Sequence, residues 1–261
     1  RPSIKGLKIS QDRYTEKSYL NSLGIKTTQF YKIDSVSDME KLLNRLKKPI
    51  LIKTRRLGYD GKGQVLIKNQ DDINQYFLGK SLAPSITEEV ISFDRELSVI
   101  IVRDKKGNIK AFEPGENVHE HGILLTTTLP TSTSEVLKNN ATIIAKKIVD
   151  DLGYIGVMGV EFFLKGQELY VNEIAPRVHN SGHWTMDGSY SSQFQQHIRA
   201  IMDLPLLSTE RHSDVIMYNL IGTVTSNLVN NELAKVYIYG KKDVLPGRKM
   251  GHVNLIKKKG S

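Results

Sequence analysis

Cysteine is absent from all 261 residues of this sequence. Its absence excludes disulfide bonds, zinc sites built on thiolates and cysteine nucleophiles, and it fits a reducing compartment. Long apolar runs are also missing, because residues 50–52 and 99–102, among the longest, are far too short to span a membrane. The first residues, RPSIKGLKIS, are too polar for a secretory signal peptide. We therefore expect a soluble, cytoplasmic protein that binds no membrane.

Positive charge dominates, but it is unevenly distributed. The formal net charge is +9, which raises nucleic acid as a partner. Residues 241–261 contain seven cations and one acid, so this segment supplies +6 of the excess. No aromatic residues are interleaved with these cations, which argues against nucleic acid. We expect the cluster around Pro246-Gly247-Arg248 to bind a small phosphorylated ligand, and the run 257–259 to be a solvated tail.

The pattern of apolar residues predicts both helices and strands, and the chain length leaves room for one large or two smaller domains. Helices are predicted over residues 12–23, 38–47, 133–152 and 191–202. Strands are predicted over residues 25–33, 49–53, 65–68, 86–90, 97–103, 155–164, 168–171, 215–224 and 234–239. Ser134 can cap the third helix and Gly153 can end it, while Asp38 is the expected cap of the second.

The stretch Asn172–Thr185, NEIAPRVHNSGHWT, concentrates chemically active groups. It holds a carboxylate, an arginine, two histidines and two asparagines with almost no apolar filler. It also follows a predicted strand, and a strand can hold such groups still. We therefore place the functional site around this stretch.

A second carboxylate, Glu161, lies in the strand before it. Residues 165–167 read as the turn of an antiparallel hairpin, and a turn centred near Gln167 would place Glu161 opposite Glu173. An earlier turn would shift the register, and the sequence leaves both registers open. Two carboxylates and the amide oxygen of Asn172 are hard donors that suit Mg²⁺ better than zinc. The alternative is that both glutamates are ordinary solvated strand residues.

A glycine-rich loop, GYDGKGQ over residues 58–64, follows a buried strand that ends in Lys53. Its glycines free the backbone to bend around a ligand, and its amide groups can cradle phosphate. The loop lacks the GK[ST] ending of a P-loop, and a basic segment precedes it where a Rossmann fingerprint needs a strand. A flap over a nucleotide is one interpretation, and a plain hairpin turn is the other.

Other polar residues have plainer interpretations. His119 and His121 would point the same way on a strand, but no strong third ligand lies nearby, so we expect no metal there. Glu88, Glu89 and Glu96 flank strands and, taken alone, would be surface charge.

Six motifs together resemble the ATP-grasp superfamily, and within it the 5-(carboxyamino)imidazole ribonucleotide synthases. The motifs are Lys53, GYDGKGQ over 58–64, EEVISFDRE over 88–96, GVMGVEFF over 156–163, NEIAPRVHNSGHWT over 172–185 and PGRKMGH over 246–252. The likeness spans residues 11–256, and the long central motif is its most specific part. It implies an α+β ATP-grasp fold, in which two α+β subdomains grip ATP, with a small β-rich C-terminal domain.

The resemblance also implies domain boundaries. Residues 1–16 would be a lead-in helix and linker, residues 17–203 the ATP-grasp domain and residues 204–261 the C-terminal domain. The family also has an amino-terminal α/β domain that closes one wall of the active site, and we expect this chain to lack it.

Roles for single residues follow from the same resemblance. ATP would be bound by Arg13, Lys53, Gly58, Tyr59, Asp60, Gly61, Lys62, Gly63, Gln64, Glu88, Glu89, Val90, Ile91, Glu96, His119, Asn172 and Glu173. Mg²⁺ would be held by Glu161, Asn172 and Glu173. The bicarbonate and aminoimidazole site would be lined by Tyr59, Asp60, Lys62, Arg177, His179 and Asn180. The phosphate of the ribonucleotide would be bound by Lys241 and Arg248.

The implied reaction is ATP-dependent carboxylation of aminoimidazole ribonucleotide by bicarbonate in purine biosynthesis, in a homodimer that binds no nucleic acid. ATP would convert bicarbonate to carboxyphosphate, Mg²⁺ and cations would offset the phosphoryl charge, and a closed flap would exclude water. Three alternatives remain: another ATP-grasp carboxylate-amine ligase, a truncated inactive paralogue, and a basic nucleic-acid-binding protein.

Overall fold

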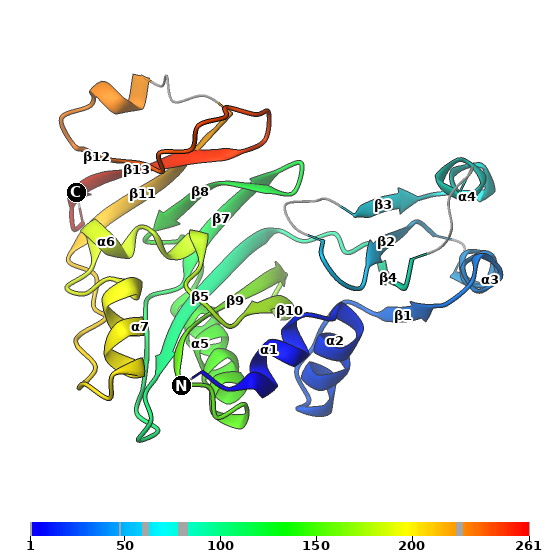
Figure 1. The fold of residues 1–261 in the computed structure, drawn as a ribbon, viewed down its shortest axis with the longest axis horizontal. Coiled ribbons are helices and arrows are strands. Elements are labelled where there is room, and N and C mark those ends of the chain that lie inside the picture. Colours follow the sequence, from blue (N-terminus) through cyan, green and yellow to red (C-terminus); the bar gives the residue numbers. More distant parts are fainter. Residues whose placement is uncertain (1, 47, 59–62, 78–82, 223–226, 261) are drawn as a thin grey trace.

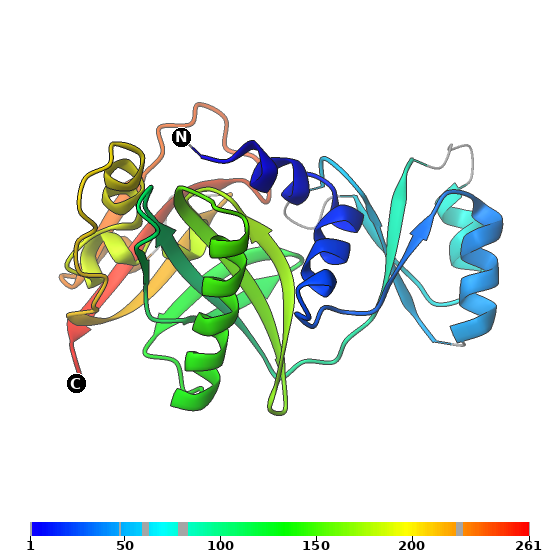
Figure 2. The ribbon, with the colours of Figure 1, turned by 90° about the horizontal axis from the view of Figure 1, so that it is seen from below.

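The protein contains two antiparallel sheets. The structure is a computed structural model that describes residues 2–46, 48–58, 63–77, 83–222 and 227–260. The smaller sheet has the strand order β1-β4-β2-β3. Its strands are β1 (Phe30–Ile33), β2 (Ile50–Thr54), β3 (Gln64–Ile67) and β4 (Ser85–Glu89). Helices α3 (Val36–Leu46) and α4 (Gln70–Phe77) lie on the side away from the larger sheet (Figures 1 and 2). Ile50, Ile52 and Ile67 pack against Met39 and Ile73 of these helices.

The larger sheet has nine strands in the order β10-β9-β5-β7-β8-β11-β13-β12, with β6 paired to β5. The strands are β5 (Arg95–Arg103), β6 (Ile109–Ala111), β7 (Gly115–Glu120), β8 (Ile123–Leu129), β9 (Gly156–Lys165), β10 (Glu168–Ala175), β11 (Ser213–Ile221), β12 (Ala234–Ile238) and β13 (Lys249–Lys258). Short elements fill the connections: α1 (Ile4–Ser10), α6 (Thr185–Gly188) and 3-10 turns over Asn180–Gly182 and Asn227–Asn230.

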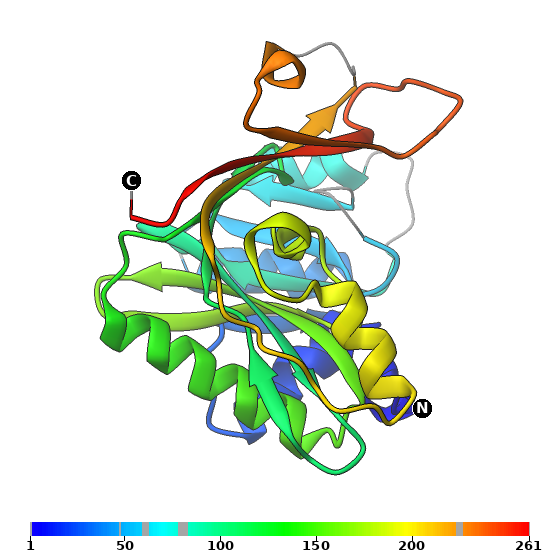
Figure 3. The same ribbon diagram turned by 90° about the vertical axis from the view of Figure 1, so that its left-hand side faces the viewer.

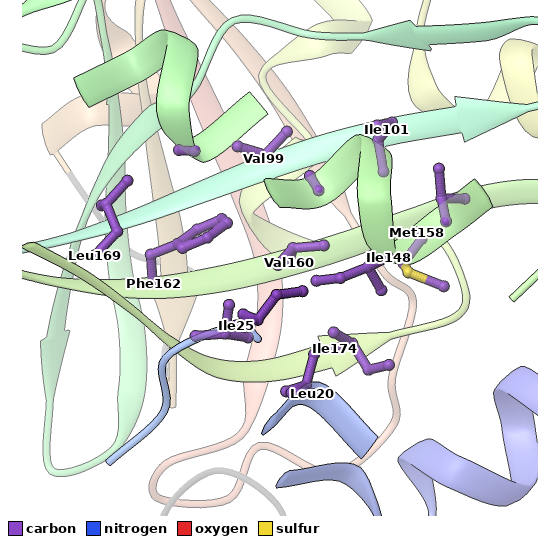
Figure 4. Packing of buried hydrophobic residues seen from close by; sticks show 14 of the residues in the cluster. Leu20, Ile25, Val99, Ile101, Ile148, Met158, Val160, Phe162, Leu169 and Ile174 are labelled. Carbon is purple, nitrogen blue, oxygen red and sulfur yellow. The ribbon is translucent and has the colours of Figure 1, made fainter. Parts of the chain in front are cut away.

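Helices cover both faces of this sheet around β5 and β9. Val99 and Ile101 of β5 pack with α5 (Glu135–Asp151) in the main core, which Figure 4 shows from close by. The alternate residues Ile100 and Val102 point to the other face, where they join Ala200 of α7 (Gln193–Ile201). Figure 3 shows α5 and α7 on opposite sides of these strands. A strand buried on both faces explains the near-continuous apolar run of β5.

Helix α2 (Arg13–Ser22) lies between the two sheets (Figures 1 and 2). Asp12 caps it by accepting from the backbone amides of Tyr14 and Thr15, and Gly24 follows its end with φ +70°. Leu20 anchors the helix in the main core. The predicted helix over 12–23 is therefore confirmed, and it occupies the junction of the two sheets.

The predicted helix over 133–152 is also confirmed, since Ser134 caps α5 and Gly153 ends it with φ +53°. The expected cap of α3 was wrong. Ser35 accepts from the backbone amide of Asp38 at 3.1 Å, so the cap precedes Asp38 by one turn. Asp38 instead lies in the first turn, where its charge suits the helix dipole.

The C-terminal strands do not form a sheet of their own, because β11 pairs with β8 and extends the larger sheet. Strand β13 was not predicted. It pairs with β11 and β12 and reaches Lys257 and Lys258. These two residues are exposed, as expected for solvated lysines, but they belong to a strand and not to a tail. Lys257 stands opposite Asp214 on β11, an opposite-charge pair that suits the end of a strand.

None of the helices in the described ranges is long and apolar enough to cross a membrane.

Candidate active site

A β-bulge in the hairpin of β9 and β10 sets the position of the acidic groups. Glu168 pairs with Lys165, and a register shift between Val171 and Glu173 then places Glu173 opposite Glu161. Val171 and Ile174 both belong to the main core, so the two residues between them, Asn172 and Glu173, lie on the other face. Consecutive strand residues normally point to opposite faces, and the bulge removes that alternation here. The sequence had left this register open.

Three side chains converge on this face. Ligand atoms of Glu161, Glu173 and His179 all lie within 4.8 Å of one another. His179 Nε2 is 3.3 Å from Glu161 Oε1, and the Asn172 amide donates to Glu161 Oε2 at 3.2 Å. The two carboxylates suit a hard divalent cation such as Mg²⁺. His179 joins a cluster in which only Glu161, Glu173 and Asn172 were expected.

His179 reaches Glu161 because Gly159, two residues before Glu161 on β9, leaves room for the His179 side chain. A methyl group added at Gly159 would meet Cβ and Cγ of His179 at 2.8 Å. Gln193, at the start of α7, fixes the His179 backbone by accepting from its amide at 2.9 Å and donating to its carbonyl at 2.7 Å. Sequence reasoning missed Gln193, because its complete burial arises only in the folded chain.

The electrostatics favour an ionised Glu161. Burial alone would raise the pKa of Glu161, but the hydrogen bond and charge of His179, together with His119, lower it to about 2. His119 itself contacts Glu96 on β5, and that contact raises the pKa of His119 although burial opposes it. His121 lies in the turn after β7 with φ +50° and its side chain 90% exposed, so it does not share the face of His119.

A cavity of about 680 Å³ opens beside the acidic cluster. Predicted site residues among those that line it are Arg13, Gly58, Glu173 and Arg177. The Arg13 guanidinium is 3.3 Å from Glu173 Oε2 and also donates to the Gly58 carbonyl at 3.5 Å. It therefore links the acidic cluster to the first residue of the glycine-rich loop. The loop residues Tyr59, Asp60, Gly61 and Lys62 lie outside the described residues.

Lys53 and Glu88 form a buried ion pair, with 2.8 Å between Nζ and Oε1. Lys17 approaches the other carboxylate oxygen at 3.3 Å, and Thr28 donates to it at 2.6 Å. Burial alone would raise the pKa of Glu88, but the two lysines lower it to about 2. Burial lowers the pKa of Lys53, and Glu88 opposes that shift. The interpretation of Glu88 as surface charge is wrong.

Residues Glu89, Val90 and Ile91 continue from β4 into the connection with β5. Tyr31 donates to Glu89 at 3.3 Å, and Val90 is exposed. Gly63 and Gln64 begin the strand side of the glycine-rich loop, where the Thr54 amide donates to the Gly63 carbonyl at 2.8 Å.

Asn180 is held by a reciprocal pair of amide hydrogen bonds with Asn219, at 2.9 and 2.7 Å. Asn219 also donates to the Leu124 carbonyl at 2.8 Å, so the pair is anchored to β8. Arg177 is exposed and donates to the Val178 carbonyl at 2.9 Å. The two residues therefore differ, since Asn180 is held by side-chain partners while Arg177 is exposed at the cavity.

The basic residues lie apart from this cluster, on the connection between β12 and β13. Lys241 donates to the Lys249 carbonyl at 2.6 Å and lies over the ring of Tyr239 at 5.5 Å. Arg248 donates to the Asp243 carbonyl at 3.0 Å, and its own carbonyl accepts from the Gly222 amide. Both cations are thus held by their own loop.

A partly buried polar network joins that connection to the central motif. The Tyr239 hydroxyl lies 3.1 Å from His183 Nδ1 and 2.8 Å from His252 Nδ1. Asn254 donates to the His183 carbonyl and to Asp187. Sequence reasoning missed these partners, because strands β12 and β13 meet the motif only in the folded chain.

These features define the class of protein, and comparisons with known families agree. The profile of the ATP-grasp domain matches residues 18–194, and that of the phosphoribosylaminoimidazole carboxylase C-terminal domain matches residues 215–261. The chain is therefore an ATP-grasp protein. Within that class, it belongs to the family of N5-carboxyaminoimidazole ribonucleotide synthases, as the curated relatives and solved structures establish.

Two curated relatives carry that name. The Brucella melitensis protein is 45% identical over 262 residues, covering 98% of this chain and 72% of the relative. The Bacillus subtilis protein is 40% identical over 256 residues, covering 96% of this chain and 67% of the relative.

Solved structures give the same result. The Thermus thermophilus N5-carboxyaminoimidazole ribonucleotide synthetase superposes with a TM-score of 0.90 at 39% identity, over 98% of this chain and 70% of that one. The Aspergillus clavatus synthase, solved with ADP and 5-aminoimidazole ribonucleotide, gives 0.89 at 30% identity over 98% and 70%. The predicted ATP-grasp fold is confirmed.

Proposed function

We propose that this chain carries out the ATP-dependent carboxylation of 5-aminoimidazole ribonucleotide by bicarbonate in purine biosynthesis, giving N5-carboxyaminoimidazole ribonucleotide, ADP and phosphate. The observation that carries the proposal is the convergence of Glu161, Glu173 and His179 beside a cavity lined by Arg13 and Gly58. The names of the relatives and the aminoimidazole ribonucleotide complex of the Aspergillus clavatus synthase support the choice of substrate.

In this proposal Glu161 and Glu173 hold Mg²⁺, with Asn172 and His179 beside them. The metal, when bound, offsets negative charge on the phosphoryl group as it moves from ATP to bicarbonate. Lys53 and Arg13 contact the phosphates of ATP, and the segment 88–91 meets adenine chiefly through its backbone. Glu96 binds the ribose hydroxyls, and His119 lies near the nucleotide because it contacts Glu96.

Bicarbonate and the aminoimidazole ring occupy the space beyond the metal. Arg177, His179 and Asn180 line it from the central motif, and Tyr59, Asp60 and Lys62 line it from the glycine-rich loop. The loop residues from Gly58 to Gln64 close over the triphosphate and exclude water, which would otherwise hydrolyse carboxyphosphate. Carboxyphosphate breaks its bond between the carboxyl carbon and the phosphate oxygen, which gives carbon dioxide and phosphate. The exocyclic amine then attacks the carbon dioxide and loses a proton, giving the carbamate. Lys241 and Arg248 bind the phosphate of the ribonucleotide.

The boundaries 1–16, 17–203 and 204–261 stay part of this proposal, as do a cytoplasmic location and a homodimer. The lack of cysteine supports a reducing compartment. Sedimentation analysis at several protein concentrations tests the dimer, and a single monomeric species at all of them rules it out.

A thermal-shift experiment with a carboxylation assay tests the function. ATP with Mg²⁺ should raise the melting temperature, because a ligand that binds only the folded state stabilises it. An oligonucleotide should not. Labelled bicarbonate should enter the product only when ATP and aminoimidazole ribonucleotide are both present. Stabilisation without carboxylation would favour another ATP-grasp ligase or an inactive paralogue, and stabilisation by oligonucleotide alone would favour a nucleic-acid-binding protein.

A further inference from the structure

Lys17 is a fully buried cation with three partners from different parts of the chain. Its ammonium lies 3.3 Å from Glu88 Oε2 on β4, 3.2 Å from the Thr28 hydroxyl and 3.3 Å from the Asn172 carbonyl on β10. Only 1% of Lys17 is exposed. A lysine is almost never buried to this degree unless it is paired.

The partners of Lys17 belong to both sheets. Asn172 is the bulge residue that places Glu173 opposite Glu161 in the larger sheet. Glu88 belongs to the smaller sheet and holds Lys53 through its other oxygen. A continuous chain of polar contacts therefore runs from the bulge of the proposed metal site, through Lys17 and Glu88, to the proposed phosphate-binding lysine.

Neighbouring residues on helix α2 make the same connection. Asp12, the cap of α2, accepts hydrogen bonds from the Arg55 guanidinium at 3.1 and 2.7 Å. Arg55 directly follows β2 of the smaller sheet. One residue after Asp12, Arg13 contacts Glu173 of the larger sheet. Because α2 lies between the two sheets in both Figures 1 and 2, its first turns fix how the two sheets face each other.

Glu88 explains why a second lysine is needed. This buried carboxylate is paired with two cations, and one of them, Lys53, is proposed to contact the phosphates of ATP. When Lys53 turns to phosphate, Lys17 remains as the counter-ion of Glu88. Without Lys17, that movement would leave a buried carboxylate unpaired, which is strongly unfavourable. The same loss would leave the Asn172 carbonyl without the Lys17 donor.

We propose that Lys17 is a positioning residue that couples the metal-site bulge to the phosphate lysine through Glu88. The proposal rests on the proposed function, since Lys53 and the acidic cluster must serve one nucleotide. Lys17 itself touches neither ATP nor the metal. Its effect is to make nucleotide affinity depend on the metal, because it joins the two sites.

The test is calorimetric titration of ADP, with and without Mg²⁺, into the whole chain and its Lys17→Met variant. Methionine keeps much of the side-chain length and removes the charge. We expect the affinity for ADP with Mg²⁺ to fall about tenfold or more, the scale of one charge-assisted contact. The ratio of affinities with and without Mg²⁺ should fall as well. The KM for aminoimidazole ribonucleotide should not change. A general loss of structure would change this KM as well, so the comparison separates the two explanations.

A matched control is Lys26→Met. Lys26 pairs with Glu168 on the same strand β10, but both side chains are exposed. This variant should bind ADP with Mg²⁺ as the unaltered chain does. The double variant Lys17→Met with Glu88→Gln should lose less than the sum of its two single variants, because both act through one contact.

Thr28→Val serves if Lys17→Met does not fold. It removes the hydroxyl that contacts both Lys17 and Glu88 and keeps the volume of the side chain. We expect a smaller loss of affinity in the same direction. The proposal is overturned if Lys17→Met binds ADP with Mg²⁺ as tightly as the unaltered chain. If Lys17→Met does not fold, the same result in Thr28→Val overturns it. If the unaltered chain binds no ADP with Mg²⁺, the proposed function fails and this proposal fails with it; binding with unchanged variants overturns only the role of Lys17.

Discussion

Glu173, on the hairpin of β9 and β10, contacts groups on two sides. Glu173 faces Glu161 and His179 on one side and the Arg13 guanidinium on the other. Its side chain is 33% exposed, so it contributes little to the core. A residue in this position affects ligand binding more than folding, because its partners are polar or charged groups beside an open cavity.

Replacing Glu173 with Gln tests the metal site at the residue scale. The change keeps the shape of the side chain but removes one negative charge, so we expect Mg²⁺-dependent ADP binding to weaken at least about tenfold. The melting temperature should change by no more than a few degrees. Calorimetry and thermal unfolding measure both. Glu168→Gln, at the exposed start of the same strand, is the control, and equal binding by the two variants would show that Glu173 is not a ligand.

Arg248 tests the assignment of the ribonucleotide phosphate. Replacing it with Ala should raise the KM for aminoimidazole ribonucleotide strongly, since one charge-assisted contact contributes about 1.5–3 kcal/mol. The KM for ATP should stay nearly constant, and steady-state kinetics with each substrate varied in turn measure both. Lys257→Ala, at the end of β13, should change neither constant. If Arg248→Ala affects ATP and ribonucleotide equally, the two ligand sites are assigned wrongly.

At the scale of elements, glycine at one strand position decides where the central motif can lie. Gly159 of β9 faces the ring of His179, and no larger residue fits between them. Gln193 of α7 then fixes the His179 backbone from the other side. Strand, loop and helix thus hold one imidazole beside Glu161, and none of the three does so alone.

A Gly159→Ala substitution should push His179 away from Glu161. Because the added methyl would lie 2.8 Å from two ring-side carbons, we expect a loss of about 1–3 kcal/mol in the free energy of unfolding. Metal-dependent ADP binding should weaken with it. Denaturant unfolding and calorimetry measure the two effects. Gly6→Ala is the control, since the added methyl there comes no closer than 3.3 Å to Tyr154 and glycine is a poor helix former.

On the scale of the whole molecule, buried histidines join the central motif to the last strands. Burial, together with the charges of His252, His179 and Lys249, lowers the pKa of His183 to about 3. Burial lowers the pKa of His252 to about 4, although Asp187 opposes that shift. These lowered pKa values favour neutral rings in the folded protein at neutral pH.

These histidines predict loss of stability in mild acid. A histidine in the unfolded chain has a pKa near 6.5, whereas in the folded protein the pKa is about 4 for His252 and about 3 for His183. The unfolded state therefore binds protons first as the pH falls. The free energy of unfolding, fully present above pH 6.5, decreases below that pH. We expect His252 to contribute about 1 kcal/mol of loss between pH 7.5 and 5.5. Contacts with Glu96 raise the pKa of His119, so its contribution has the opposite sign.

Comparing variants isolates the effect. In His252→Gln the loss between pH 7.5 and 5.5 should be smaller than in the unaltered chain, as thermal unfolding at each pH would record. His121→Gln, whose ring is exposed in a turn, should lose as much as the unaltered chain. An identical pH response in His252→Gln and the unaltered chain would contradict the assigned protonation.

The sequence by itself determined the class of the protein and most local structure. Ser134 and Gly153 define the ends of α5 within a few residues, because backbone preferences and short hydrogen bonds act locally. The central motif identified the family for the same reason, since its chemistry is contained in one continuous stretch.

Only the tertiary structure decided which distant residues meet. The bulge at Asn172 sets the register of Glu161 and Glu173. It shifts the alternation of core residues between Val171 and Ile174, and a single phase shift in so short a pattern does not by itself identify a bulge. The sequence alone indicated that Glu88 was a surface charge. In the folded chain it is paired with Lys17 of α2 and Lys53 of β2. Strand pairing and burial depend on segments far apart in the chain, so the pairing of β11 with β8 and the burial of Glu88 arise only when the sheets assemble.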